Sequence, residues 1–362
     1  MQYENVITEV QQELYKHTEW QDRYKNYIEE INTKAKNNTF KNAQKQFALP
    51  APFHLYMPLS MVLNDCSSKR TVFDLRFHGQ SVANLFVSNN EQKKVDIKIK
   101  KKQAIYNALI DAGMTEETNS FVNIVDKTVD WHSKDAKDFR QIYTELEKNL
   151  RDNPQQHLKG QPEHELESEL LKNYSQKSSD KKEFSFIQPV MMPDTHARFQ
   201  MPTPIKASNL KNDMTKPSYS KSYGGGIDIL ARIGSGYNTK LAVIELKDEN
   251  TKSEPPHKAI RQAIAYATFL RELIRSESGE KWWKFFGFKE PVPEKLTIKA
   301  IIAMPYRNKK GEVDTHTTEF INFIDFTDTV NKKIQIPKTT DYIELEYIFR
   351  DPPREIKKSF LK

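Results

Sequence analysis

The chain has little of what stabilises secreted proteins or places a protein in a membrane. It contains one cysteine, Cys66, among 362 residues, so neither an intrachain disulfide nor a cysteine-based zinc site can form. No run approaches the roughly 18 consecutive apolar residues of a membrane span, and the opening MQYENVITEV lacks the basic and apolar regions of a signal peptide. We therefore expect a cytoplasmic protein with no membrane partner.

Positive charge is unevenly distributed. The formal net charge is +7, and residues 201–300 hold 17 Lys or Arg against 11 Asp or Glu, whereas residues 1–150 hold 21 against 20. A local basic excess favours a polyanionic partner such as nucleic acid, although many solvated surfaces are this basic.

The first half of the chain is typical of an α+β domain. Apolar residues at helical spacing predict one amphipathic helix over residues 8–31, packed on its own domain because no heptad is sustained. The runs TVFDLRFHG, SVANLFVS and KVDIKIK predict an antiparallel sheet. Lysines at 98, 100, 101 and 102 give that sheet a basic face, which suggests target recognition or protein docking. The polar segment 151–156 predicts a boundary between domains 1–152 and 153–362.

The second half alternates helices and strands. A helix is expected over residues 163–174, and EFSFIQPV and ARFQMPTPI are typical of strands. The runs GIDILARI and KLAVIELK, joined by GSGYNT, predict a hairpin. A helix over 258–275 follows, and then the strands LTIKAIIAMP, EFINFIDF and YIELEYIF. The predicted class is α/β, with a mixed sheet flanked by helices.

Charged residues occur in two of these apolar strands. Residues two apart on a strand point to one face, so Glu245 and Lys247 project together. Asp228 is the acidic residue of GIDILARI, where an uncompensated charge is costly. In a hairpin Asp228 and Glu245 converge, and with the main-chain carbonyl of Leu246 they form a partial oxygen shell for Mg²⁺. The alternative is a structural ion pair at a strand end.

Such a site suits phosphodiester hydrolysis. Mg²⁺, or Mn²⁺ in its place, lowers the pKa of its water and neutralises charge on phosphoryl oxygens, while Lys247 orients or helps deprotonate the attacking water. The segment Gly226-Ile227-Asp228, followed by Glu245-Leu246-Lys247, resembles the core of the PD-(D/E)XK nuclease superfamily. Ile227 stands where the family name has proline, a residue that supplies no ligand atom.

Two helices extend the resemblance to about residues 160–305. Gln262 and Tyr266 in QAIAY resemble the Q-x-x-x-Y element of RecB-type members, which lies beside the metal and the nucleic-acid backbone; the alternative is an ordinary helix surface. EHELESEL is similar to the helix that opens this fold and supplies an acidic residue. We expect Glu167 in that role, with Glu163 and Glu169 as rivals and a solvated acidic face as the alternative.

The resemblance implies a restriction-endonuclease-like fold, preceded by a separate α+β domain. It further implies a metal-dependent deoxyribonuclease, an endonuclease, acting on DNA in restriction, phage defence or repair. The alternative function is a nucleic-acid-binding protein that retains the fold without cleaving. A homodimer, and a protein partner docked on the N-terminal domain, are the further partners considered.

Other candidates rank lower. Lys258 and Arg261 flank Gln262 and are expected phosphate contacts. The segment KWWKFFGFK is interpreted as aromatics packed under a loop rather than a base-stacking surface. The three glycines at 224–226 allow a tight approach to the strand of Asp228. Asp74 with Asp96-Ile97-Lys98 repeats the acidic pattern on a half-exposed strand and is set aside, and the histidines show no metal-ligand spacing.

Overall fold

A computed structural model gives the fold. It describes residues 3–58, 70–89, 94–100, 107, 125–152, 162–175, 187–207, 216–247, 256–305, 333–351 and 355–356. Cys66, Lys101, Lys102 and the expected strand EFINFIDF lie outside these ranges. Within them the protein is mixed α/β, and none of its helices combines the length and apolar character needed to cross a membrane.

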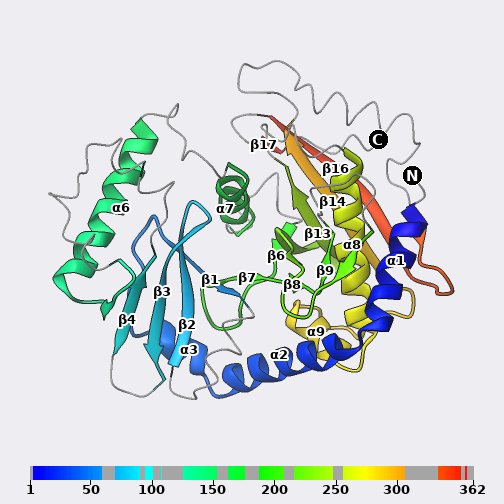
Figure 1. The fold of residues 1–362 in the computed structure, drawn as a ribbon, viewed down its shortest axis with the longest axis horizontal. Coiled ribbons are helices and arrows are strands. Elements are labelled where there is room, and N and C mark those ends of the chain that lie inside the picture. The colour runs from blue at the N-terminus through cyan, green and yellow to red at the C-terminus, as the bar shows by residue number, and fades with distance from the viewer. Residues whose placement is uncertain are drawn as a thin grey trace. The chain divides into compact units, whose positions relative to one another are not determined.

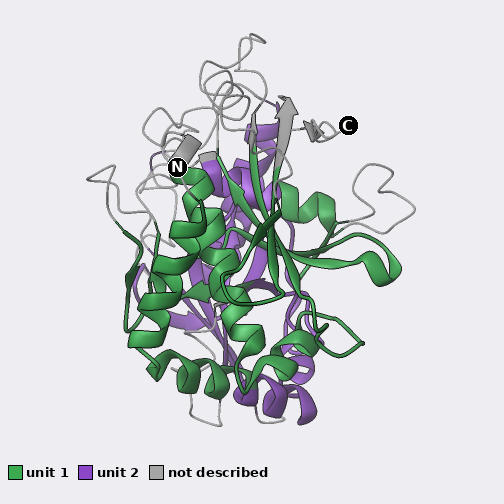
Figure 2. Ribbon diagram, turned by 90° about the vertical axis from the view of Figure 1, so that its right-hand side faces the viewer, with its two compact units in different colours: residues 1–28, 170–190, 200–362 green, residues 29–169, 191–199 purple. Residues whose placement is uncertain are grey.

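The chain divides into two compact units (Figure 2). Unit 1 contains residues 1–28, 170–190 and 200–362, and unit 2 contains residues 29–169 and 191–199. This division differs from the single boundary expected after residue 152, because the first 28 residues pack with the second half of the chain. It also passes within helix α7 (Pro162–Tyr174), whose residues from Leu170 onward belong to unit 1.

Unit 1 is built on a mixed sheet (Figure 1). Its three central strands are parallel to one another, and the expected hairpin of GIDILARI and KLAVIELK is confirmed as an antiparallel pair at their side. A one-turn 3₁₀ helix, η3 (Gly236–Asn238), closes that hairpin. In spatial order the strands are β15 (Lys333–Gln335), β16 (Tyr342–Asp351), β14 (Thr297–Pro305), β13 (Lys240–Leu246), β12 (Ile229–Ile233) and β6 (Ile187–Pro189), with β17 (Glu355–Ile356) paired to β16.

Helix α8 (Pro256–Arg275) covers the centre of this sheet, where it packs on β13 and β14. The expected apolar stripe is confirmed, since Ala263, Ala267, Leu270 and Ile274 are all buried. Beyond it, α9 (Gly279–Phe285) buries Trp282 and Trp283, which confirms that the KWWKFFGFK aromatics pack in the core. Two short ladders, β8 (Pro202–Thr203) with β11 (Gly225–Gly226) and β9 (Ile205–Lys206) with β10 (Ser218–Tyr219), complete the unit.

The single N-terminal helix expected over residues 8–31 is in fact two helices, α1 (Tyr3–Lys16) and α2 (Glu19–Lys36). The break lies at residues 17 and 18, where the Thr18 carbonyl accepts from Gln21 N–H and Trp20 Nε1 donates to the Leu14 carbonyl. Helix α1 packs on α8 within unit 1 rather than on the N-terminal sheet, and Gln11 Nε2 donates to Glu272 Oε1 of α8 at 2.8 Å.

Unit 2 contains the expected N-terminal antiparallel sheet. Among the described residues its helices are the end of α2 from Glu29, α3 (Thr39–Gln44), α6 (Lys134–Asp152) and α7 as far as Glu169. The strands, in spatial order, are β5 (Thr128–Asp130), β4 (Val95–Ile99), β3 (Gln80–Ser88), β2 (Arg70–Phe77), β1 (His54–Pro58) and β7 (Arg198–Gln200).

A buried ion-pair network explains Asp74 in this sheet. Its carboxylate is 2% exposed and accepts from Arg76 Nε at 2.7 Å, from Lys100 Nζ at 3.1 Å and from the Ser81 hydroxyl. Arg76 also lies over the Tyr56 ring, 4.0 Å from its centroid. Asp74 is thus neutralised inside its own unit, as expected of a structural group.

Asp341 ties the start of β16 to α8 in unit 1. Its carboxylate, 2% exposed, accepts from Arg271 Nε at 2.8 Å, from Arg275 Nη2 at 2.6 Å and from Leu296 N–H at 2.9 Å. Burial alone would raise the pKa of Asp341, but the hydrogen bonds from Arg275, Leu296 N–H and Arg271 outweigh burial and hold it below its ordinary value of 3.8.

Replacing Asp341 by Asn should destabilise unit 1, because Arg271, 8% exposed, would lose a buried counter-charge. We expect the free energy of unfolding to fall by about 3 kcal/mol. Urea denaturation followed by tryptophan fluorescence measures the change, since Trp20, Trp282 and Trp283 all lie in unit 1.

A control and a pH dependence sharpen this test. Glu290, which is exposed, should tolerate replacement by Gln within about 0.5 kcal/mol. Because the folded pKa of Asp341 is lowered, its contribution is complete above 3.8 and is lost as the pH falls further. The difference between wild type and Asp341→Asn should therefore shrink in acid, and a pH-independent difference would contradict the ion-pair account.

Candidate metal centre

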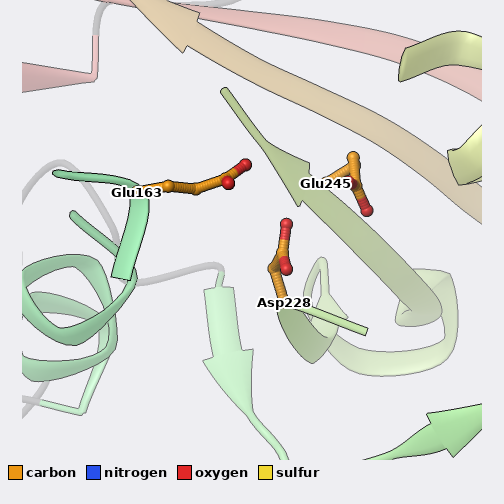
Figure 3. A group of neighbouring side chains, drawn as sticks. All are labelled: Glu163, Asp228 and Glu245. Atoms are coloured by element: carbon orange, nitrogen blue, oxygen red, sulfur yellow. The ribbon is translucent and has the colours of Figure 1, made fainter. Parts of the chain in front are cut away.

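The β12–β13 hairpin brings two carboxylates together at its open end. The register pairs Ile229 with Ile244, so Asp228 and Glu245 follow as the next opposed positions. Asp228 lies in a bend just before β12 rather than inside the strand, and it is half-buried. Its Oδ2 accepts from Leu246 N–H at 2.8 Å. One carboxylate oxygen of Asp228 and one of Glu245 lie within 4.8 Å of each other (Figure 3).

Lys247 lies beside Glu245, as the spacing on the strand predicts. Lys247 Nζ donates to Glu245 Oε1 at 2.8 Å, and the two side chains are 3% and 1% exposed. The Lys247 N–H donates to the Ala303 carbonyl of β14 at 2.8 Å, which fixes the backbone after β13 ends. The ammonium is therefore buried and paired with the Glu245 carboxylate.

Gln262 and Tyr266 of α8 are also at this site. Both are buried, at 8% and 1% exposure, and Gln262 Nε2 donates to the Tyr266 hydroxyl at 3.4 Å. Burial raises the pKa of the Tyr266 phenol well above its ordinary value, and the charges of Glu245 and Asp228 raise it further. Tyr266 therefore stays protonated at neutral pH. Gln262 Oε1 is buried and accepts no hydrogen bond within the described part of the chain.

The glycines before Asp228 permit this close packing, as expected. A Cβ built on Gly225 would lie 2.3 Å from the Tyr266 hydroxyl oxygen, and one on Gly224 would lie 2.5 Å from the Ile205 carbonyl carbon. Neither glycine has a positive φ. Glycine is required at these two positions by the lack of space for a side chain.

The acidic residues of α7 differ in their surroundings. Glu167 is 3% exposed, and within unit 2 its charge helps raise the pKa of both Tyr56 and Arg76. Glu163 and Glu169 are half-buried. Glu167 stays a prediction, because its own unit already supplies a reason for a buried carboxylate there.

The remaining candidates are placed as follows. Lys258 and Arg261 lie half-buried on the first turns of α8, and an Arg261 Nη2 is 3.9 Å from Glu9 Oε2 of α1. Strand β4 alternates as expected of a half-exposed strand, with Lys98 exposed, and Lys100 is engaged by Asp74.

One aromatic side chain near the carboxylates was not anticipated. Tyr223 is 55% exposed, and its hydroxyl would contact a Cβ on Gly226, two residues before Asp228. The sequence feature that could have identified Tyr223 is an aromatic residue directly before three glycines.

The donor set fits a divalent cation. Asp228 and Glu245 provide hard carboxylate oxygens, which Mg²⁺ prefers. A carboxylate oxygen of Asp228 and one of Glu245 lie within 4.8 Å of each other in a part-buried position, where gathering like charges is costly. A bound cation would offset that charge.

Comparison of the chain with family models, with curated proteins and with solved structures finds no match. The account of the site therefore depends on its geometry.

Gly225→Ala should destabilise unit 1 by about 1 to 3 kcal/mol, because the new methyl overlaps the Tyr266 hydroxyl. Adding Tyr266→Phe removes that oxygen, and the nearest remaining ring atom would lie 3.3 Å away. We expect the double variant to recover most of the loss in urea denaturation.

The matched control is Tyr223→Phe, which removes the other neighbouring hydroxyl and should leave the Gly225→Ala loss unchanged. Equal destabilisation of Gly225→Ala with and without Tyr266→Phe would contradict the packing of Tyr266 at the carboxylates.

Proposed function

We propose that the protein is a Mg²⁺-dependent nuclease that hydrolyses phosphodiester bonds, with DNA as its substrate. The observation that carries the proposal is the convergence of Asp228, Glu245 and Lys247 at the open end of one hairpin. Two carboxylates with oxygens within 4.8 Å of each other are hard oxygen ligands for a metal ion, which favours a metal centre over a structural ion pair. The basic excess of residues 201–300 supports a polyanionic substrate.

Each side chain has a task in this proposal. Asp228 and Glu245 hold the metal, and the Leu246 N–H orients Asp228 by donating to its Oδ2. The Lys247 ammonium, held by Glu245, lies where it can orient a water or place positive charge beside a phosphoryl oxygen. When bound, Mg²⁺ supplies a Lewis acid that lowers the pKa of water and offsets the charge of the reacting phosphate.

Gln262 and Tyr266 have positioning roles. The protonated Tyr266 phenol can donate to an anionic oxygen, and the buried Gln262 Oε1 can accept from a water or an N–H group. Both side chains come from α8, which packs rigidly on β13 and β14.

The finer fold assignment belongs to the same proposal. Three parallel strands, an antiparallel hairpin bearing the carboxylates and a covering helix bearing Gln262 and Tyr266 match the restriction-endonuclease-like arrangement that the motifs imply. Unit 2, with Lys98 exposed on its sheet, would then serve target recognition or protein docking.

Replacing Lys247 by Ala should lower cleavage at least ~100-fold, the usual contribution of a positioned general acid or base. Asp228→Asn, which keeps an oxygen to accept from Leu246 N–H, should abolish cleavage. The assay uses supercoiled plasmid, linear duplex, single-stranded DNA and RNA, each with Mg²⁺, Mn²⁺ or EDTA, and circular dichroism checks the fold of each variant.

Lys98→Ala is the matched control for this assay, since it removes the lysine of the other Asp-x-Lys triplet from an exposed position. It should cut like wild type. Metal-dependent cutting that survives Asp228→Asn would reject the proposed centre. Binding of DNA with no cutting in any metal would favour the alternative, a nucleic-acid-binding protein that does not cleave.

A further inference from the structure

Tyr223 combines exposure with closeness to the candidate metal centre. Its side chain is 55% exposed. A Cβ on Gly226 would lie 2.8 Å from the Tyr223 hydroxyl oxygen, and Gly226 is two residues from Asp228. Tyr223 is also close enough to Tyr266 for its ionisation to raise the pKa of Tyr266. The ring therefore lies at the solvent-facing margin of the centre.

The backbone of the loop that carries Tyr223 is held in place by hydrogen bonds. Gly224 N–H donates to the Thr203 carbonyl at 2.8 Å, and the Ser220 hydroxyl donates to the Tyr223 carbonyl at 2.9 Å. From α2, Arg23 Nη1 donates to the carbonyls of Lys221 and Ser222. An aromatic ring on a pinned loop loses little conformational entropy when a ligand covers it.

The side chains around Tyr223 favour a nucleotide base as the ligand. An exposed aromatic ring next to exposed Lys221 pairs a stacking surface with a positive charge, the combination that holds single-stranded nucleic acid. A paired base in a duplex is already stacked on both faces by its neighbours. A ring beside the reacting phosphate can therefore stack only on an unpaired base.

We propose that Tyr223 stacks on the unpaired base adjacent to the phosphate held at the metal centre, so that the enzyme selects single-stranded or locally unpaired nucleic acid. This inference rests on the proposed function, and it names the substrate class of that site. In this role the Tyr223 ring contacts the base at the catalytic site, and its hydroxyl is not needed for stacking.

The test uses an oligonucleotide with one 2-aminopurine, whose fluorescence falls when the base stacks on an aromatic ring. Binding is measured in Ca²⁺ in the non-cutting Asp228→Asn background. We expect quenching in that background and in Asp228→Asn/Tyr223→Phe. In Asp228→Asn/Tyr223→Ala the quenching should be lost and the affinity should be roughly 5- to 150-fold weaker.

Tyr237→Ala is the matched control, because Tyr237 is a 98% exposed tyrosine at the other end of the same hairpin. It should keep both quenching and affinity. With active protein, Tyr223→Ala should raise KM for single-stranded substrate more than it lowers kcat, and Tyr223→Phe should restore KM.

The outcomes separate this inference from the proposed function. Cleavage by wild type with quenching that does not depend on Tyr223 would overturn the stacking role and leave the nuclease in place. No cleavage in any metal, with Tyr223-dependent quenching, would support the stacking surface in a protein that binds without cutting. No cleavage and no quenching would overturn both.

Discussion

The register of the β12–β13 hairpin is the constraint on which the candidate centre depends. Pairing Ile229 with Ile244 sets Asp228 opposite Glu245, and the bond from Leu246 N–H to Asp228 Oδ2 holds the bend that follows. A slip of one residue would turn Glu245 to the other face of the sheet. The apolar residues between the two ends resist such a slip, since β13 is buried along almost its whole length.

Burial around this hairpin strengthens the interactions between its charges. Helix α8 covers β13, and α1 packs on α8 in turn. Trp20, at the start of α2, lies edge to face with Phe269 of α8, with 5.8 Å between their ring centroids. Charges shielded from water in this way interact more strongly than surface charges do. The first helix of the chain, far from the centre in sequence, thus helps to exclude water from the helix that carries Gln262 and Tyr266.

Local patterns predicted the parts of this architecture that depend on neighbouring residues. The hairpin, the buried strand β13 and the apolar stripe of α8 follow from alternation and helical spacing within single segments. The packing of α1 on α8 was missed because it joins segments about 250 residues apart, and no local pattern encodes that choice. The helical spacing of α7 likewise left several glutamates as candidates for the acidic role, because burial decides among them and spacing does not.

The surroundings of the carboxylates distinguish the candidate centre from the other acidic group in an apolar strand. Asp74 is one carboxylate that accepts from two cations, Arg76 and Lys100, so unit 2 neutralises it without a ligand. At the open end of the hairpin, in contrast, the register brings two carboxylates together, with oxygens of Asp228 and Glu245 within 4.8 Å of each other. A fold that gathers like charges in a part-buried place loses free energy unless something offsets them. Under the proposed function, a divalent cation would offset them.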